Sequence, residues 1–178
     1  MSDHSKKYEN LNEMFVAVQA MNKFQSIHNV IRKDYIVLLK TTGGNISTVV
    51  TFDALYRASL RSLFSLIEAD IYALNKLDQY SGYADRDTFN DKFKKTFTQI
   101  ATTWKKEAIK NEYFDSNLKE LKELKKMRDE LVHPKEIAHI HKASESDFQK
   151  LKKVFNEYDT FINDLMNNFF LNSTVSFS

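Results

Sequence analysis

Residues 52–77 read FDALYRASLRSLFSLIEADIYALNKL and contain neither glycine nor proline. Apolar side chains recur in this stretch every three or four residues, which is the period of an α-helix with one broad buried face. The apolar face comprises Phe52, Leu55, Tyr56, Leu60, Leu63, Leu66, Ile67, Leu74 and Leu77. Because so wide a face has to be covered by several neighbours, the stretch predicts the central helix of a bundle.

Two further features of residues 52–77 bear on packing. A row of small side chains beside the apolar face allows another helix to approach closely, either within the chain or across a dimer. The row comprises Ala54, Ala58, Ser62, Ser65, Ala69 and Ala73. Asp70 lies at the centre of the apolar face, where a carboxylate needs a partner. Glu68 points to the opposite side of the helix.

The rest of the chain is also poor in turn-forming residues. Among 178 residues there are only 3 glycines and 1 proline, too few for a sandwich, a barrel or an α/β fold. We therefore expect an all-α fold, with one domain over residues 1–178 and flexible ends at 1–7 and 172–178. About five helices should pack up and down, and they should span roughly residues 8–39, 52–77, 88–110, 115–133 and 146–169.

Two local signals refine the expected boundaries. Ser146 stands three residues before Gln149, a spacing typical of a capping box at the start of the last helix. Residues 41–45 include two glycines and have β-branched neighbours, so a small hairpin is expected there.

The composition also excludes several classes of protein. The chain has no cysteine, which excludes a disulfide, a zinc–thiolate centre and a thiol nucleophile. No apolar run is long enough to span a bilayer, and the polar residues 1–7 do not resemble a signal peptide. We therefore expect a cytoplasmic protein without membrane contact. The 14 phenylalanines exceed what one small bundle core requires, which suggests that some serve an interface.

Residues 127–134 (MRDELVHP) hold an arginine, a histidine and the single proline. The helix that leads into them has an apolar face formed by Leu121, Leu124, Met127 and Leu131. Arg128 lies about 50° from the centre of that face, so its cation has to snorkel, pair with a carboxylate or serve a site between helices. Pro134 disfavours a helical conformation of His133, which we therefore expect to end the helix.

An arginine, a polar residue and then a histidine a few positions later form the motif of the HEPN superfamily, and Arg128, Asp129 and His133 resemble its short form. The resemblance implies a compact helical homodimer that is, in many members, a metal-independent endoribonuclease with the Arg/His pair at a dimer cleft. It also implies a toxin or phage-defence effector, with RNA and an antitoxin or regulatory protein as partners. One subgroup is modified on a tyrosine two residues after the histidine; Lys135 stands there, so that regulation is not expected.

The resemblance assigns catalytic roles to Arg128, Asp129 and His133. Histidine suits proton transfer to and from RNA oxygens because its ordinary pKa is about 6.5, and the planar fork of arginine suits phosphate. Asp70 or Glu68 would support the site by orienting Arg128.

Basic residues near the motif are candidate RNA contacts. Residues 91–135 hold 12 lysines and arginines against 8 acidic residues, whereas the whole chain has a net charge of only +2. The candidates are Lys119, Lys122 and Lys126 on the outer face of the helix and Lys135 after it. A lysine row of this kind is, however, also typical of a solvated helix face.

Other interpretations compete with the catalytic one. Arg128 can pair with Asp70 in the core while His133 merely ends a helix, and His28 falls on a helical stripe typical of a core or interface histidine. Four potential metal ligands lie close in sequence: His133, Glu136, His139 and His141. Their spacing matches no familiar metal site, so we expect no metal and no cofactor. The alternative function is a catalytically silent helical protein that binds and regulates a partner protein.

Overall fold

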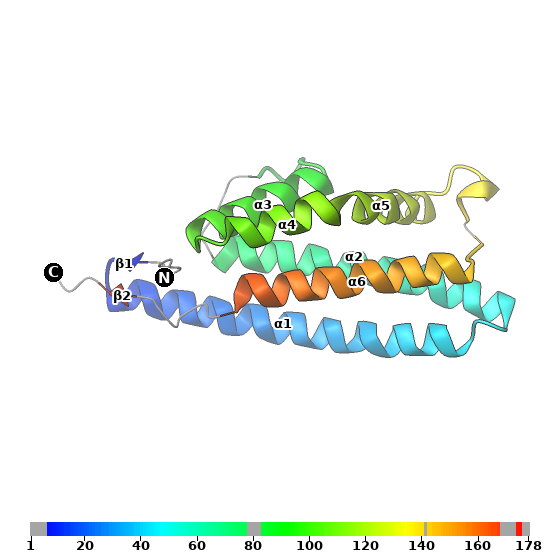
Figure 1. Cartoon of the computed structure of the whole chain (residues 1–178), viewed down its shortest axis with the longest axis horizontal. Helices are drawn as coiled ribbons and strands as arrows, with labels where there is room; N and C mark the ends of the chain where they lie inside the picture. The colour runs from blue at the N-terminus through cyan, green and yellow to red at the C-terminus, as the bar shows by residue number, and fades with distance from the viewer. Residues whose placement is uncertain (1–6, 78–82, 141, 168–173, 176–178) are drawn as a thin grey trace.

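The computed structural model describes residues 7–77, 83–140, 142–167 and 174–175. These residues form an all-α bundle, as the sequence predicts, with an elongated shape (Figure 1). Its α-helices are α1 (Leu11–Gly44), α2 (Val49–Leu77), α3 (Phe89–Thr103), α4 (Glu107–Ser116), α5 (Leu118–Val132) and α6 (Glu145–Met166). A single turn of 3₁₀-helix, η1 (Ile137–His139), lies between α5 and α6.

The long helices define the axis of the molecule. Figure 1 shows α1, α2 and α6 running along this axis, with α3, α4 and α5 in a second layer on one side. The α1–α2 turn and the α5–α6 connection lie at one end, and α1 begins at the other. Helix α2 contacts α1, α3, α5 and α6, so the predicted central helix is confirmed.

The core gathers around α2 because its apolar face is as broad as the sequence indicates. Leu60, Leu63, Leu66 and Ile67 are fully buried, and so is Phe64, which the predicted face does not include. Only Leu55 among the nine predicted positions stays partly exposed. At about 1.5–3 kcal/mol for each large apolar side chain, this face is a major source of stability.

Six helices are present in the described residues where about five were expected, because the third predicted helix breaks at residues 104–106. Lys105 adopts a positive φ of 53°, which redirects the chain into α4. Trp104 is buried beside this break. The Lys106 ammonium donates to the carbonyls of Asp164 (2.9 Å), Leu165 (2.8 Å) and Asn167, and thereby caps the end of α6.

Two predicted boundaries are wrong. The hairpin expected at residues 41–45 does not form, since α1 continues to Gly44. A side chain at Gly43 would place its Cβ 3.3 Å from the Phe148 ring of α6, so this glycine permits close packing of the two helices. The capping box of α6 uses Ser144 and Asp147 instead of Ser146 and Gln149.

The two chain ends meet in a short parallel strand pair. Strand β1 (Lys7–Tyr8) pairs with β2 (Thr174–Val175), and Tyr8 is fully buried. Most of the residues expected to be flexible, 1–6, 172–173 and 176–178, lie outside the described residues. Residues 7 and 174–175, which were included in that expectation, are paired.

Candidate functional site

The end of α5 is the centre of the candidate site. The helix stops at Val132, and His133 has non-helical backbone angles (φ −128°, ψ 64°). Its N–H still donates to the carbonyl of Asp129 (3.0 Å), which completes the last turn. The predicted break before Pro134 is therefore confirmed, and the exposed imidazole of His133 leaves the helix axis.

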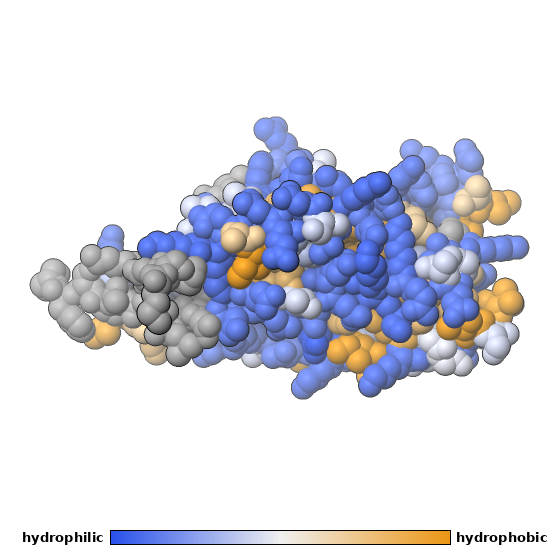
Figure 2. All heavy atoms as spheres, in the orientation of Figure 1, coloured by the Kyte–Doolittle hydropathy of each residue, from blue (hydrophilic) through white to orange (hydrophobic). Residues whose placement is uncertain are grey.

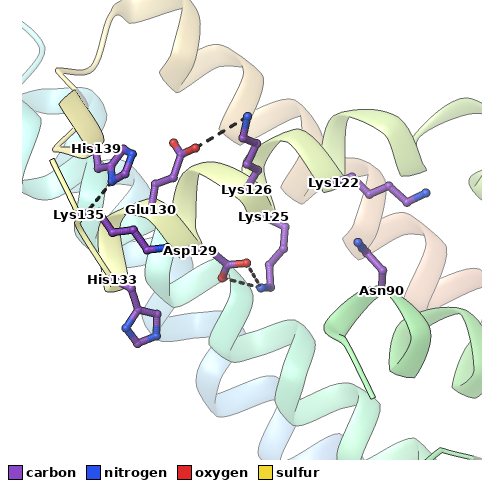
Figure 3. Close-up of a pocket in the computed structure, with 9 residues that line it drawn as sticks. All are labelled: Asn90, Lys122, Lys125, Lys126, Asp129, Glu130, His133, Lys135 and His139. Atoms are coloured by element: carbon purple, nitrogen blue, oxygen red, sulfur yellow. Dashed lines mark hydrogen bonds and ion pairs between the residues drawn. The ribbon is translucent and has the colours of Figure 1, made fainter. Parts of the chain in front are cut away.

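A pocket of about 520 Å³ opens beside His133. It is lined by Asn90, Lys122, Lys125, Lys126, Asp129, Glu130, His133, Lys135 and His139 (Figure 3). Both lining carboxylates already face cations. Asp129 accepts two contacts of 2.6 Å from the Lys125 ammonium, and Glu130 lies 3.9 Å from that of Lys126. Lys122 and Lys135 form no ion pair with any described residue, so the pocket has positive charge left for an anion.

Arg128 lies beside this pocket but does not line it. One guanidinium nitrogen donates to the Glu68 carboxylate of α2 (2.7 Å) and another to Asp129 (3.1 Å). The guanidinium carbon lies 6.0 Å from the centre of the Phe64 ring. Glu68, the alternative partner in the sequence analysis, therefore orients Arg128. The predicted Arg128–Asp70 pair is wrong.

Asp70 instead joins three long helices. Its two oxygens lie 2.9 and 3.0 Å from Nδ1 of His28 on α1, and it accepts a 2.9 Å hydrogen bond from the hydroxyl of Tyr158 on α6. Burial raises the pKa of Asp70, and the hydrogen bonds and charge of its partners oppose that rise. Glu68 and Asp70 project from different sides of α2, so only Glu68 reaches α5. The core role expected for His28 is confirmed.

Asp129 links the pocket to Arg128. Burial disfavours the charged form of Asp129. Lys125 and Arg128 donate hydrogen bonds to its carboxylate and carry positive charges, and together these effects outweigh burial and lower the pKa of Asp129. At neutral pH it is therefore an ionised acceptor that holds a pocket lysine on one side and the guanidinium on the other.

Among the residues of this site that were not predicted, Lys125, His139 and Arg61 have defined contacts. The side chain of Lys125 is only 12% exposed, and its position four residues before Asp129 is a signal that could have revealed the pair. Nδ1 of His139 accepts the backbone N–H of Lys135 (3.0 Å), so its neutral ring carries the proton on Nε2. Arg61 of α2 donates to the carbonyl of Leu131 (3.1 Å) and caps the end of α5.

The predicted lysine row divides in the structure. Lys122 and Lys126 line the pocket, and Lys135 joins them from the following loop. Lys119 instead lies beside a separate depression between α5 and α6. Ion pairs cross that depression, from Lys153 to Glu120 (2.8 Å) and from Lys150 to Glu123. The structure thus brings three of the four predicted RNA-binding lysines together.

Three remaining findings concern metals, membranes and known proteins. Within the described residues, no three histidine or acidic side chains are grouped so that they could hold a metal ion; His141 lies outside these residues. The helices of the described residues include none with the length and apolar character needed to cross a membrane. No family model, curated protein or solved structure matches the chain.

Proposed function

We propose that this chain is a metal-independent endoribonuclease of the HEPN type, with RNA as its substrate. The observation that carries the proposal is the position of His133, which is exposed and lines a pocket together with four lysines. Lysine ammonium groups bind phosphate as point charges, and histidine is the side chain suited to proton exchange near neutral pH. This combination supports cleavage of a phosphodiester better than binding of a neutral ligand.

In the proposed reaction, His133 takes the proton from an RNA 2′-hydroxyl, and the 2′-oxygen attacks the adjacent phosphorus. The bond between phosphorus and the 5′-oxygen breaks, and that oxygen takes up a proton. The products are a 2′,3′-cyclic phosphate and a 5′-hydroxyl. His139 lines the same pocket and, with its proton on Nε2, supplies a donor for the leaving oxygen. Lys122 and Lys135 offset the charge that builds on the phosphate.

The proposal includes a homodimer. Arg128 is turned toward Glu68 and does not line the pocket of its own chain. A twofold dimer can place Arg128 of the partner subunit against His133 and so complete the site from two chains. Arg128→Ala and His133→Ala proteins, each inactive alone, should then regain about a quarter of wild-type activity when they are unfolded and refolded together, by statistical pairing. A mixture that stays inactive, with heterodimers confirmed, contradicts the shared site.

A second candidate function is a catalytically silent protein that binds a partner protein, such as an antitoxin or regulator. It is favoured by apolar side chains at the same end of the molecule: Val49 (68% exposed), Val50 (82%), Ile137 (88%) and Ile140 (49%). Figure 2 shows orange surface at this end, near the α1–α2 turn and the α5–α6 connection. Exposed apolar groups that lie together are typical of protein interfaces.

Incubating the purified full chain with RNA in excess EDTA distinguishes the two functions. Cleavage to 2′,3′-cyclic phosphate ends is expected for the wild type. His133→Ala should abolish cleavage and leave the helical circular dichroism unchanged. Glu136→Gln, an exposed substitution in the same loop outside the pocket, should keep activity. Cleavage that requires Mg²⁺, or that survives His133→Ala, contradicts the proposed mechanism.

A further inference from the structure

Helix α1 carries apolar side chains on two faces. One face packs into the core of the bundle and includes the buried residues Met21 and Tyr35. Three valines of the same helix stay exposed, Val16 (42%), Val30 (61%) and Val37 (63%). Figure 1 shows α1 along the outer edge of the bundle, with α2 and α6 on its inner side. The exposed valines therefore belong to a surface that the fold of the single chain does not use.

These valines lie in a row of α1 residues, the α1 seam, that has the spacing of a coiled coil. Successive positions are four and three residues apart in strict alternation, which is the pattern that lets one helix pack along another. Each position is exposed or half-buried. By helical rotation, the seam lies about 180° from Arg32 and Gly43, which contact α6. The α1 seam comprises Val16, Ala20, Lys23, Ile27, Val30, Asp34, Val37 and Thr41.

Two charged residues in the seam indicate what covers it. Lys23 and Asp34 form no ion pair with any described residue. If two copies of α1 run antiparallel, centred between residues 28 and 29, Lys23 faces Asp34 of the partner subunit on both sides of the centre. A parallel pair would instead place each charge against its own copy, and like charges repel. The facing positions of the antiparallel pair are Val16 with Thr41, Ala20 with Val37, Lys23 with Asp34, and Ile27 with Val30.

We propose that the α1 seam binds a second copy of this chain, with the two α1 helices packed antiparallel about a twofold axis. Ile27 and Val30 form the apolar centre, and the Lys23–Asp34 ion pairs flank it and fix the orientation. The seam is about 38 Å long, at about 1.5 Å per residue. A contact between two single helices is small for a stable interface, so we expect a micromolar dissociation constant.

This contact is separate from the shared site proposed at the end of α5. Helix α5 lies in the other layer of the bundle, and antiparallel α1 helices hold the two α5 ends at opposite ends of the pair (Figure 1). The α1 contact therefore neither requires nor completes the pocket beside His133. Chains that form both contacts assemble as a tetramer, and chains that form the α1 contact alone assemble as a dimer.

Reversing the charges of the seam tests the proposal. Light scattering measures the mass of the full chain at about 100 µM, where one chain weighs 20.9 kDa. Lys23→Glu makes both ion pairs repulsive and should weaken association at least about tenfold, which halves the mass. Lys33→Glu makes the same charge change at an exposed position of α1 outside the seam and should leave the mass unchanged. The double variant Lys23→Glu/Asp34→Lys restores opposite charges and should regain the wild-type mass.

Lys23 and Asp34 are exposed in the single chain, so these variants should keep the helical circular dichroism of the wild type. A wild-type mass of one chain would overturn the proposal and leave the seam for a different protein. Equal masses of Lys23→Glu and Lys33→Glu, or a double variant that does not recover, would overturn it as well.

Introduced thiols test the orientation, because the natural chain has no cysteine. Ala20→Cys and Val37→Cys proteins should form a disulfide-linked dimer when they are mixed and oxidised. Neither should do so alone, since antiparallel packing keeps two copies of the same position about 25 Å apart, and a disulfide needs Cα atoms within about 7 Å. Disulfides in either protein alone, or none in the mixture, would contradict the antiparallel pair.

Discussion

Replacing Asp70 by alanine removes the acceptor through which α1, α2 and α6 are connected. Two donors then lose their partner: Nδ1 of His28, whose side chain is 8% exposed, and the hydroxyl of Tyr158, which is fully buried. Each buried donor without a partner costs about 1–3 kcal/mol. Because two donors are left without a partner, we expect Asp70→Ala to lower the free energy of unfolding by about 3–5 kcal/mol.

Urea unfolding followed by circular dichroism at 222 nm measures this change. For a domain of this size, 1 kcal/mol corresponds to about 2–4 °C, so the melting temperature should fall by roughly 6–20 °C. Asp34→Ala is the matched control, because Asp34 is an exposed carboxylate on α1. The control should change stability by less than about 0.5 kcal/mol.

A double-mutant cycle with Tyr158→Phe tests the physical reason for the loss. The phenylalanine removes one of the two donors that Asp70→Ala leaves without a partner, so the double variant should lose less stability than the two single variants added together. Additive losses would refute the hydrogen bond as the source of the effect. A change in Asp70→Ala no larger than that in Asp34→Ala would refute the assigned role of the whole network.

Three further predictions concern the candidate site and the capping of α6. If the pocket binds RNA, Lys122→Ala should weaken RNA binding and reduce its salt dependence by about one counterion, whereas Lys119→Ala should have little effect in the same filter-binding titration. The pKa of Asp129 is lowered in the folded chain, so the ionised carboxylate stabilises the fold at pH values above 3.8, its ordinary pKa. In acid unfolding curves, the extra stability of the wild type over Asp129→Asn should therefore be lost as the pH falls below 3.8 and through the lower pKa of the folded chain. Lys106→Met removes three hydrogen bonds to the end of α6 and should cost about 1.5–3 kcal/mol in urea unfolding, against almost nothing for the exposed Lys94→Met; equal effects of the two would contradict the capping role.

Much of the fold follows from periodicity because apolar spacing reports burial directly. It identifies α2 as the centre of the bundle, and Pro134 identifies the end of α5. Periodicity does not identify the break between α3 and α4. A single positive φ at Lys105 leaves no apolar signature, and the Lys106 cap depends on the distant end of α6.

The candidate site was predictable only where its residues lie on one helix. The position of Arg128 shows that it needs a carboxylate, but two carboxylates, Glu68 and Asp70, stand two residues apart on α2. The choice between them depends on which side of α2 packs against α5, which is a property of the folded bundle. Likewise, His139 and Arg61 enter the site from other segments, and no local spacing marks them.

The different partners of Glu68 and Asp70, both on α2, also determine how activity data on Arg128 variants have to be interpreted. Asp70 connects α2 to α1 and α6 through hydrogen bonds with His28 and Tyr158. Glu68 connects α2 to α5 through its ion pair with Arg128, and Arg61 of α2 donates a hydrogen bond to the end of α5. Arg128→Ala therefore leaves Glu68 without its cation and loosens the turn that positions His133, so a loss of cleavage would have two explanations. Arg128→Lys separates them, because lysine keeps the charge opposite Glu68 but lacks the planar fork that binds phosphate at two points. A variant that melts like the wild type and no longer cleaves would assign the guanidinium to the chemistry, whereas retained cleavage would assign it to the scaffold.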